Sequence, residues 1–226
     1  MHADDTPVPA WRGATRGEHR WPAAAVVVAT VALQLLLPDE LVLRPWWLLP
    51  AVTASLIVAL LLINPGRVSR RTPVDRAVAL GVVAVVSVAN TASAVGLVTG
   101  IVDGSIANRP GPVLVSAAIV YWTNIVVFSL WYWEFDRGGP GRRAAGTAEF
   151  PDLMFPQMSS PELAPKDWEP AYPDYLYLSF TNATAFSPTD VMPLRRWVKL
   201  TMMLQSAISL IIALLVVAWA VGALNS

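Results

Sequence analysis

Residues 172–217 read YPDYLYLSFTNATAFSPTDVMPLRRWVKLTMMLQSAISLIIALLVV, and this stretch decides how the rest of the chain is interpreted. A short amphipathic segment is followed by a Ser/Pro/Thr loop, a basic hinge and a long apolar helix. The helix predicted over residues 194–223 exceeds the roughly 20 residues that a helix needs to cross a bilayer. The segment over residues 172–185 is too short to cross, so we expect a re-entrant or interfacial helix there.

The composition of the whole chain is that of a membrane protein. Of 226 residues, 55% are hydrophobic and only 14% are charged, whereas soluble domains carry about 25% charged residues. There is no cysteine, which excludes disulfides and thiol chemistry. The two histidines, His2 and His19, both precede the first apolar run. We therefore expect no cofactor and no metal site in the body of the protein.

Four more apolar segments precede the opening stretch. They cover residues 21–37, 46–63, 77–102 and 113–133, and tryptophans stand at the start of the first two, as anchors at a membrane interface do. The predicted fold class is an all-α membrane protein with five transmembrane helices and a short re-entrant or interfacial helix before the last span.

The chain divides into four predicted regions. Residues 1–20 are polar and are predicted to be a flexible tail, and residues 21–136 form a four-helix membrane domain. Residues 137–171 are rich in proline, which predicts a long loop without regular elements. Its apolar residues suggest that part of this loop packs against the protein or the membrane surface. Residues 172–226 hold the short helix and the last span.

Basic residues are distributed unequally between the predicted loops. If five spans alternate, 14 of the 16 Lys and Arg residues fall on one side and only Arg44 and Arg109 fall on the other. The positive-inside rule then places the N-terminus and the Pro-rich loop in the cytoplasm and the C-terminus outside. The predicted location is a bacterial-type inner membrane, with the lipid bilayer as a partner and no nucleic acid.

Residues 177–193, YLSFTNATAFSPTDVMP, resemble the pore loop of two-helix potassium channels, which typically reads like YFSFVTLTTVGYGDIVP. The coinciding residues are Tyr177, Ser179, Phe180, Thr184, Asp190 and Pro193. The helix that follows is similar to the inner helix of those channels. The resemblance implies a channel-like or transport protein that handles monovalent cations as a homo-oligomer, with a tetramer as the first expectation. The chain also resembles a group of uncharacterised bacterial membrane proteins with a C-terminal Tyr-x-Ser-Phe-Thr segment.

The sequence departs from those channels at the ion filter. Ser187 and Thr189 replace two glycines, and Pro188 replaces a tyrosine. Glycine is needed there because it adopts positive φ freely, whereas proline fixes φ and has no N–H. A potassium-selective filter is therefore not expected, and any conduction should be poorly selective. The pore loop of those channels also faces outside, whereas the charge count places this loop inside.

The hydroxyl, amide and acidic groups of this segment are the candidate ion-pathway residues: Thr181, Asn182, Thr184, Ser187, Thr189 and Asp190. The alternative interpretation is an interfacial helix followed by a turn, in which Asp190 caps the last helix.

Other polar residues lie within the predicted spans. They are Asn90, Thr91, Ser93, Thr123, Asn124, Gln205, Ser206 and Ser209. They predict either one polar seam or a set of interhelical hydrogen bonds. Glu134 and Asp136 end the fourth span and are predicted to be solvated. No ionisable residue lies deep within a span, which argues against a proton-coupled pump or a voltage sensor.

Two functional classes remain open from the sequence. The first is an atypical channel or transport protein, and the second is a non-conducting structural or accessory membrane protein. An enzyme is not expected, because the chain lacks a nucleophile, base and metal set. The best enzymatic case, a site of Asp136, Asp174 and Asp190, has no specific spacing.

Overall fold

The computed structural model describes residues 9–42, 45–63, 66–68, 72–105, 110–148, 150–184 and 190–224. It is 74% helical, so the predicted all-α class is confirmed. The helices are α1 (Trp21–Gln34), α2 (Leu48–Ile63), α3 (Pro73–Val102), α4 (Pro110–Phe135), α5 (Pro140–Ala144), α6 (Pro156–Ser159), α7 (Tyr172–Thr184) and α8 (Arg196–Leu224). Short 3-10 turns cover η1 (Ala10–Arg12), η2 (Asp39–Leu41), η3 (Asp136–Gly138) and η4 (Pro161–Leu163). Two strands, β1 (Leu153–Met154) and β2 (Met192–Pro193), form an antiparallel ladder.

The start signals of two helices can be read directly from the chain. Thr72 precedes α3, and its side chain accepts a hydrogen bond from the backbone N–H of Asp75 at 3.1 Å. Pro73 occupies the first turn, where its missing N–H costs nothing. At the start of α7, the Asp174 carboxylate accepts from the N–H of Ala171 at 2.8 Å. Both contacts satisfy N–H groups that a helix start leaves unpaired.

Three of the described helices are long and apolar enough to cross a membrane: α3, α8 and the helix that contains α4. The apolar helices α1 and α2 have 14 and 16 residues, which is shorter than the usual crossing length. The structure thus agrees with a membrane-embedded protein, while the count of five spans is not confirmed.

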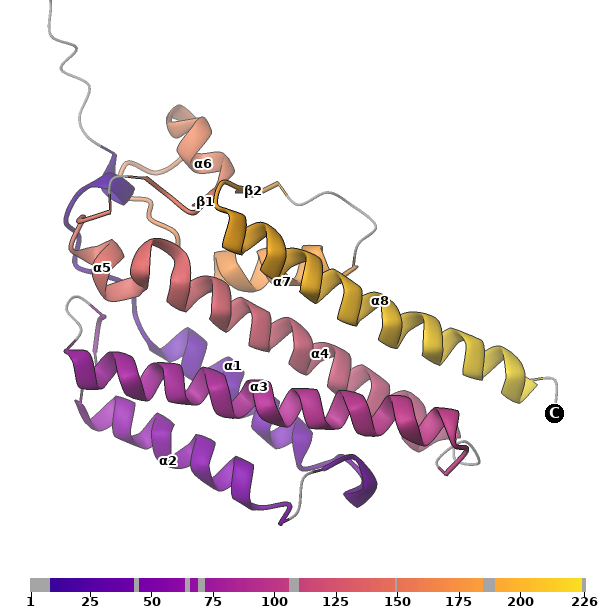
Figure 1. The fold of residues 1–226 in the computed structure, drawn as a ribbon. Helices are drawn as coiled ribbons and strands as arrows, with labels where there is room; N and C mark the ends of the chain where they lie inside the picture. Colours follow the sequence, from indigo (N-terminus) through magenta and orange to yellow (C-terminus); the bar gives the residue numbers. More distant parts are fainter. Residues whose placement is uncertain are drawn as a thin grey trace, which may run out of the picture.

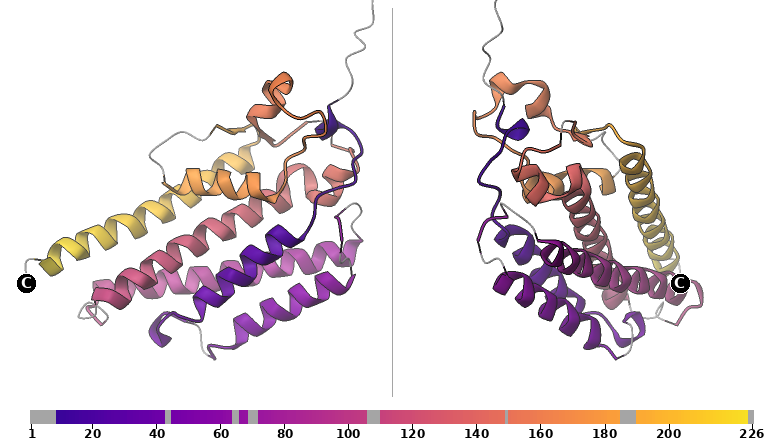
Figure 2. Two further views of the ribbon diagram at one scale, coloured as in Figure 1. Left: turned by 180° about the vertical axis from the view of Figure 1, so that it is seen from behind. Right: turned by 60° about the vertical axis from the view of Figure 1, so that its left-hand side comes forward.

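Helix α4 is the centre of the bundle. It contacts α1 and α3 on one side and α7 and α8 on the other. Figure 1 shows α1, α2 and α3 as one group below α4, with α8 above it, and Figure 2 shows the same arrangement from two further directions. Most of the apolar part of α4 is buried, whereas α8 leaves most of its surface exposed. This exposed apolar surface is where lipid or further protein would pack.

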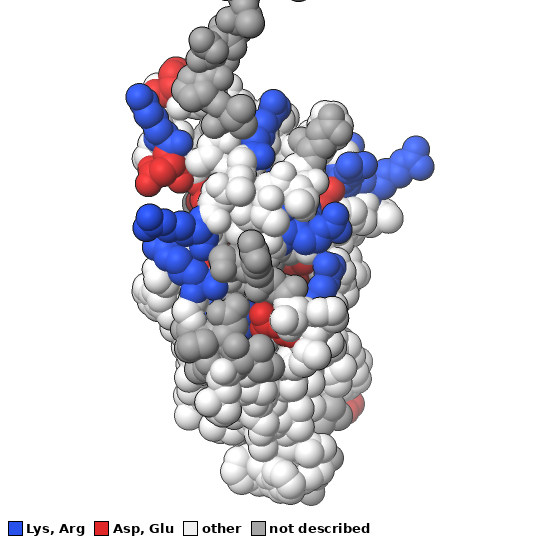
Figure 3. Space-filling view, turned by 90° about the vertical axis from the view of Figure 1, so that its left-hand side faces the viewer, with Lys and Arg blue, Asp and Glu red and all other residues white. Residues whose placement is uncertain are grey.

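Charged residues gather at one end of the bundle, which we call the charged end. Figure 3 looks onto this end and shows Lys and Arg side chains distributed around it. The described basic residues all belong to residues 12–20, 67–76, 137–166 and 195–199, which lie at this end. The other end, where α1, α3 and α8 finish, is called the opposite end.

The structure differs from the prediction for the N-terminal tail. Residues 9–20 pack against the charged end instead of remaining flexible: Trp11 is buried, and the N–H of Thr15 donates to the carbonyl of Ala144 at 2.8 Å. Residues 1–8 lie outside the described part of the chain.

The Pro-rich region also differs from the prediction, because it contains α5, β1, α6 and η4 as short elements. The expectation that its apolar residues pack is confirmed for Leu153, Phe155 and Met158, which are buried. Proline limits these elements to a few residues each, but their side chains still complete a core above α4 and α7.

Candidate functional site

Helix α7 enters the bundle from the charged end and stops halfway along α4. Three hydrogen bonds mark its path: Tyr172 Oη to Ser129 Oγ at 2.9 Å, Ser179 Oγ to the Ile125 carbonyl at 2.6 Å, and Tyr121 Oη to the Ala183 carbonyl at 2.8 Å. The partners on α4 therefore move from its last turns to its middle. A helix of 13 residues is only about 20 Å long, which agrees with an end beside the middle of α4.

The chain returns to the charged end after α7. Residues 185–189 lie outside the described residues, but Asp190 is again beside α7, with its carboxylate 3.4 Å from Tyr177 Oη. Two residues later, Met192 pairs with Met154 in the β1–β2 ladder at the charged end. The segment thus enters and leaves the bundle at the same end, as Figure 1 shows for α7 and β2.

A cluster of amide and hydroxyl groups forms where α7 meets α8, and Gln205 is its centre. The Gln205 Nε2 group donates to both the carbonyl and the hydroxyl of Ser179, at 2.8 and 2.7 Å. Its Oε1 atom accepts from Tyr132 Oη and from Asn182 Nδ2, both at 2.8 Å. All four residues are buried. Two donors and two acceptor positions are the full capacity of a glutamine amide, so Gln205 joins α4, α7 and α8 with every bond it can make.

A second polar contact continues toward the opposite end. Asn124 on α4 donates to Ser209 Oγ on α8 at 3.1 Å and accepts from Asn90 Nδ2 on α3 at 3.3 Å. The Oδ1 atom of Asn90 is buried and has no hydrogen-bond partner within the described part of the chain. The predicted interhelical hydrogen bonds are thus confirmed for Asn90, Asn124, Gln205 and Ser209. Gln205 and Ser209 lie four positions apart on α8, and we call the two groups of buried hydrogen bonds together the polar chain.

Of the predicted ion-pathway residues, only Asn182 joins this polar chain. The hydroxyls of Thr181 and Thr184 bond to carbonyls of their own helix, at 3.0 Å in each case. Asp190 is exposed and lies six positions before Arg196, where α8 begins, so it does not cap that helix. Ser187 and Thr189 lie outside the described residues.

The charged end is held by ion pairs that were not predicted. Glu18 pairs with Arg143 at 2.8 Å, and the same carboxylate accepts from Trp133 Nε1 at 2.6 Å and from the N–H of Tyr172 at 2.7 Å. Burial raises the pKa of Glu18, while Arg143 and the two N–H donors oppose that rise. Glu18 thereby ties the N-terminal segment to the ends of α4 and α7.

Asp136 is the second buried acid, and the prediction that it is solvated is wrong. Its carboxylate accepts from Tyr175 Oη at 2.6 Å and from the N–H groups of Asp152 and Leu153 at 3.2 and 3.3 Å. Glu134, which was also expected in solvent, is 2% exposed. The segments that follow α4 fold back over Asp136 and supply these three donors.

The chain makes a tight turn directly after Asp136. Arg137, Gly138 and Gly139 all have positive φ values, of 52°, 80° and 94°. Arginine rarely adopts this conformation, but here its N–H donates to Asp152 at 2.7 Å and its guanidinium donates to the Trp11 carbonyl at 2.6 Å. These contacts stabilise the strained turn, after which the chain folds back over the end of α4.

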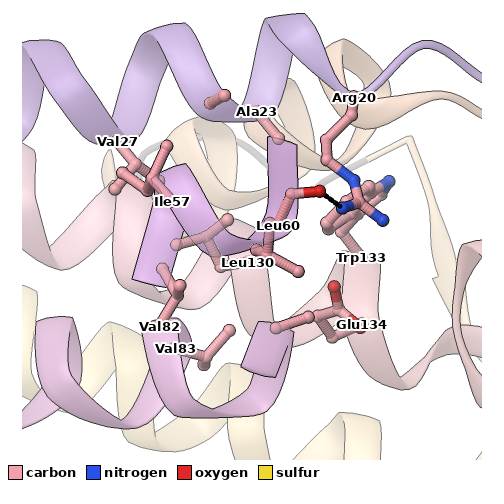
Figure 4. A pocket seen from close by; sticks show the side chains of 12 residues that line it. Arg20, Ala23, Val27, Ile57, Leu60, Val82, Val83, Leu130, Trp133 and Glu134 are labelled. Atoms are coloured by element: carbon pink, nitrogen blue, oxygen red, sulfur yellow. Dashed lines mark hydrogen bonds between the residues drawn. The ribbon is translucent and has the colours of Figure 1, made fainter. Parts of the chain in front are cut away.

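Another ion pair joins the residue before α1 to α3 beside a small cavity. Arg20 lies 3.1 Å from Asp75 and donates to the Leu60 carbonyl at 2.8 Å. Figure 4 shows Arg20 and Glu134 at one end of this cavity, with apolar side chains of four helices around the rest. Its volume of about 40 Å³ suffices for a few water molecules, since one needs about 10–15 Å³. It is too small for a solute.

The described residues contain no group of three or more His, Asp or Glu side chains placed to hold a metal ion. Compared with known protein families, with characterised proteins and with solved structures, the chain shows no significant match.

Proposed function

We propose that this protein is a membrane channel or transporter in which α7 is a re-entrant helix and the polar chain lines the path of a monovalent cation. The observation that carries the proposal is the position of α7. The helix ends beside the middle of α4 and adds Ser179 and Asn182 to the cluster around Gln205. Partial helices at membrane depth are tolerated where protein or a water-filled path covers their ends, and such helices form the substrate sites of many transporters.

In this proposal the structure represents a closed path. Gln205 already makes four hydrogen bonds inside the protein, so an ion or water would have to replace some of them. The oxygens of Gln205, Asn124 and Tyr132 are the groups that would then solvate a cation. Without filter glycines, selectivity between monovalent cations would be weak.

The proposal includes an assembly of several copies, with a tetramer as the first expectation. The side of α7 that carries Tyr177 and Phe180 is about half exposed in the single chain. An exposed aromatic face on a partial helix suits contact with another copy around a shared axis. The charged end would face the cytoplasm, because basic residues favour that side.

The second candidate is a non-conducting structural or accessory membrane protein. The complete pairing of Gln205 favours it. A network in which every hydrogen bond is already made needs no ion, and holding α7 between α4 and α8 is then a sufficient role for it. Cation flux through purified protein in liposomes separates the two. We expect Gln205→Ala to raise the flux severalfold, because it removes the four bonds that close the path and leaves space that water can fill. Gln205→Leu fills the same space with an apolar side chain and should abolish the flux.

Thr201→Ala is a suitable control, since Thr201 lies on α8 and its hydroxyl, among the described residues, bonds only to the Trp197 carbonyl of its own helix. It should conduct as the unmodified protein does. If the unmodified protein and Gln205→Ala are equally silent while remaining folded and monodisperse, the structural role is correct and the transport proposal is wrong.

A further inference from the structure

Helix α8 has one continuous exposed face, which we call the outer stripe. In Figure 1, α8 runs along the outside of the bundle. The stripe begins in the first turn with Arg196 and Lys199, which are both exposed. It continues with six apolar residues that are 52–67% exposed: Leu200, Met203, Leu204, Leu210, Ile211 and Leu214. At 3.6 residues per turn, all these positions fall on one side of the helix. A positively charged start therefore leads directly into an apolar surface.

The two positive charges of the outer stripe have no partner in the part of the chain that the structure describes. Neither Arg196 nor Lys199 forms an ion pair there, whereas the adjacent Arg195 does. No acidic residue follows Asp190 in the sequence, so α8 itself supplies none. Residues 185–189, which read AFSPT, carry no ionisable side chain either. An anionic group from outside the chain would therefore meet two unpaired cations at the start of α8.

The length of the stripe matches one leaflet of a bilayer. From Lys199 to Leu210 it extends about 16 Å, at 1.5 Å per residue, and the hydrocarbon core of a bilayer is about 30 Å thick. An acyl chain that lies along this part of α8 would have its headgroup at the level of Arg196 and Lys199. Both side chains suit a phosphate, since arginine can bind it through two N–H groups and lysine binds it as a point charge.

A second copy of the chain fits the outer stripe less well than a lipid does. Two copies that met through this face would bring four positive charges together, with no acid on either α8 to balance them. Like charges placed against each other are unfavourable at an interface. A zwitterionic phospholipid also fits less well, because its headgroup carries a cation that the two basic residues would repel. A headgroup with a net negative charge has only the attractive part.

We propose that the outer stripe binds an anionic phospholipid. Its phosphate accepts hydrogen bonds from the Arg196 guanidinium and the Lys199 ammonium, and one acyl chain lies along Leu200, Met203 and Leu204. Basic residues beside a membrane-crossing helix attract anionic lipids in this way. The binding requires α8 to face the bilayer, but it does not depend on whether the protein conducts cations.

Native mass spectrometry of the purified full-length protein, released from detergent micelles, measures the binding. Phosphatidylglycerol and phosphatidylcholine with identical oleoyl chains are titrated separately, and each bound lipid adds its mass to the protein. We expect phosphatidylglycerol to bind at least fivefold more tightly. Glycerol 3-phosphate carries the charge but lacks the acyl chains, so it should not displace the lipid even in hundredfold excess.

Charge reversal locates the site. Lys199→Glu places a negative charge beside the headgroup and should abolish the preference for phosphatidylglycerol. Acidic residues are favourable in the first turn of a helix, so this variant should fold. Arg196→Gln should reduce the preference severalfold. Arg142→Glu on α5 is the matched control: Arg142 is also exposed, and the variant changes the net charge as Lys199→Glu does, so the preference should persist.

Circular dichroism and the Tm of each variant show whether it is folded. The proposal is overturned if the unmodified protein shows no preference, if the folded variants Lys199→Glu and Arg196→Gln retain it, or if Arg142→Glu loses it equally. Displacement of the lipid by glycerol 3-phosphate would also overturn it. The same would follow from a dimer whose formation excludes the lipid, because a second copy would then cover the stripe.

Discussion

Glu18 and Arg143 form an ion pair of 2.8 Å although 125 positions separate them in the chain. Both side chains are more than nine-tenths buried. Neither charge stands alone, because Glu18 also accepts from Trp133 and Tyr172, while Arg143 donates to the Trp133 carbonyl at 2.6 Å. The pair therefore joins the N-terminal segment, the end of α4 and the start of α7 in one place.

Replacing Glu18 by alanine should destabilise the protein strongly. The change leaves the Arg143 guanidinium buried without its carboxylate and removes the acceptor of two N–H groups. Breaking one side of a buried ion pair costs about 3–5 kcal/mol. Thermal unfolding in detergent measures the effect as a lower Tm. Arg142→Ala is the control, since Arg142 is exposed and should change the Tm little. An unchanged Tm for Glu18→Ala would show that the pair is not formed.

Replacing Gln205 by leucine should loosen α7 before it unfolds the whole bundle. Four interhelical hydrogen bonds are lost, and such bonds in membrane proteins are worth about 0.6 kcal/mol each. Hydrogen exchange should become faster in α7 and remain slow in α3, because the four hydrogen bonds of Gln205 go to α4 and α7. Thr201→Ala again serves as the control. Equal exchange rates in α7 with and without the substitution would contradict this role of the cluster.

The helices were predictable because apolar length is a local property. Apolar runs located α3, α4 and α8 within a few residues, and the short segment at residues 172–185 corresponds to α7 at Tyr172–Thr184. The extra turn at the start of α3 follows from the cap of Thr72, which lies outside the apolar run. The polar positions Asn90, Asn124, Gln205 and Ser209 also stood out, since amides and hydroxyls are conspicuous within apolar segments.

The ion pairs at the charged end were not predictable, because the paired residues are far apart in the sequence. Nothing near Glu18 indicates that Arg143 is its partner, and a polar segment before a span usually remains in solvent. The two glycines after Arg137 were a visible turn signal, but they did not reveal that Asp136 would be enclosed. Thr181 and Thr184 were attractive as pathway residues, yet a threonine in a helix readily bonds to its own backbone.

Replacing Gly139 by alanine should destabilise the turn after Asp136. Gly139 has a φ of +94°, and an added Cβ atom would lie 2.8 Å from the Glu134 carbonyl oxygen. A strained backbone conformation costs about 1–3 kcal/mol, so the Tm should fall. Gly222→Ala is the matched control: an added Cβ there meets nothing within 4 Å, and alanine is favoured in a helix. If both variants unfold at the same temperature, the turn is not as constrained as the structure indicates.

The orientation of the chain can be tested with single cysteines, because the protein has none of its own. Ala145 is exposed at the charged end and Ser105 is exposed at the opposite end, so Ala145→Cys and Ser105→Cys report on the two sides. If the charged end faces the cytoplasm, as its basic residues predict, a membrane-impermeant maleimide added to intact cells should label Ser105→Cys alone. Ala145→Cys should react only after permeabilisation. The reverse pattern would place the entry of α7 outside. Labelling of both positions in intact cells would instead show that the two ends are not on opposite sides of a membrane.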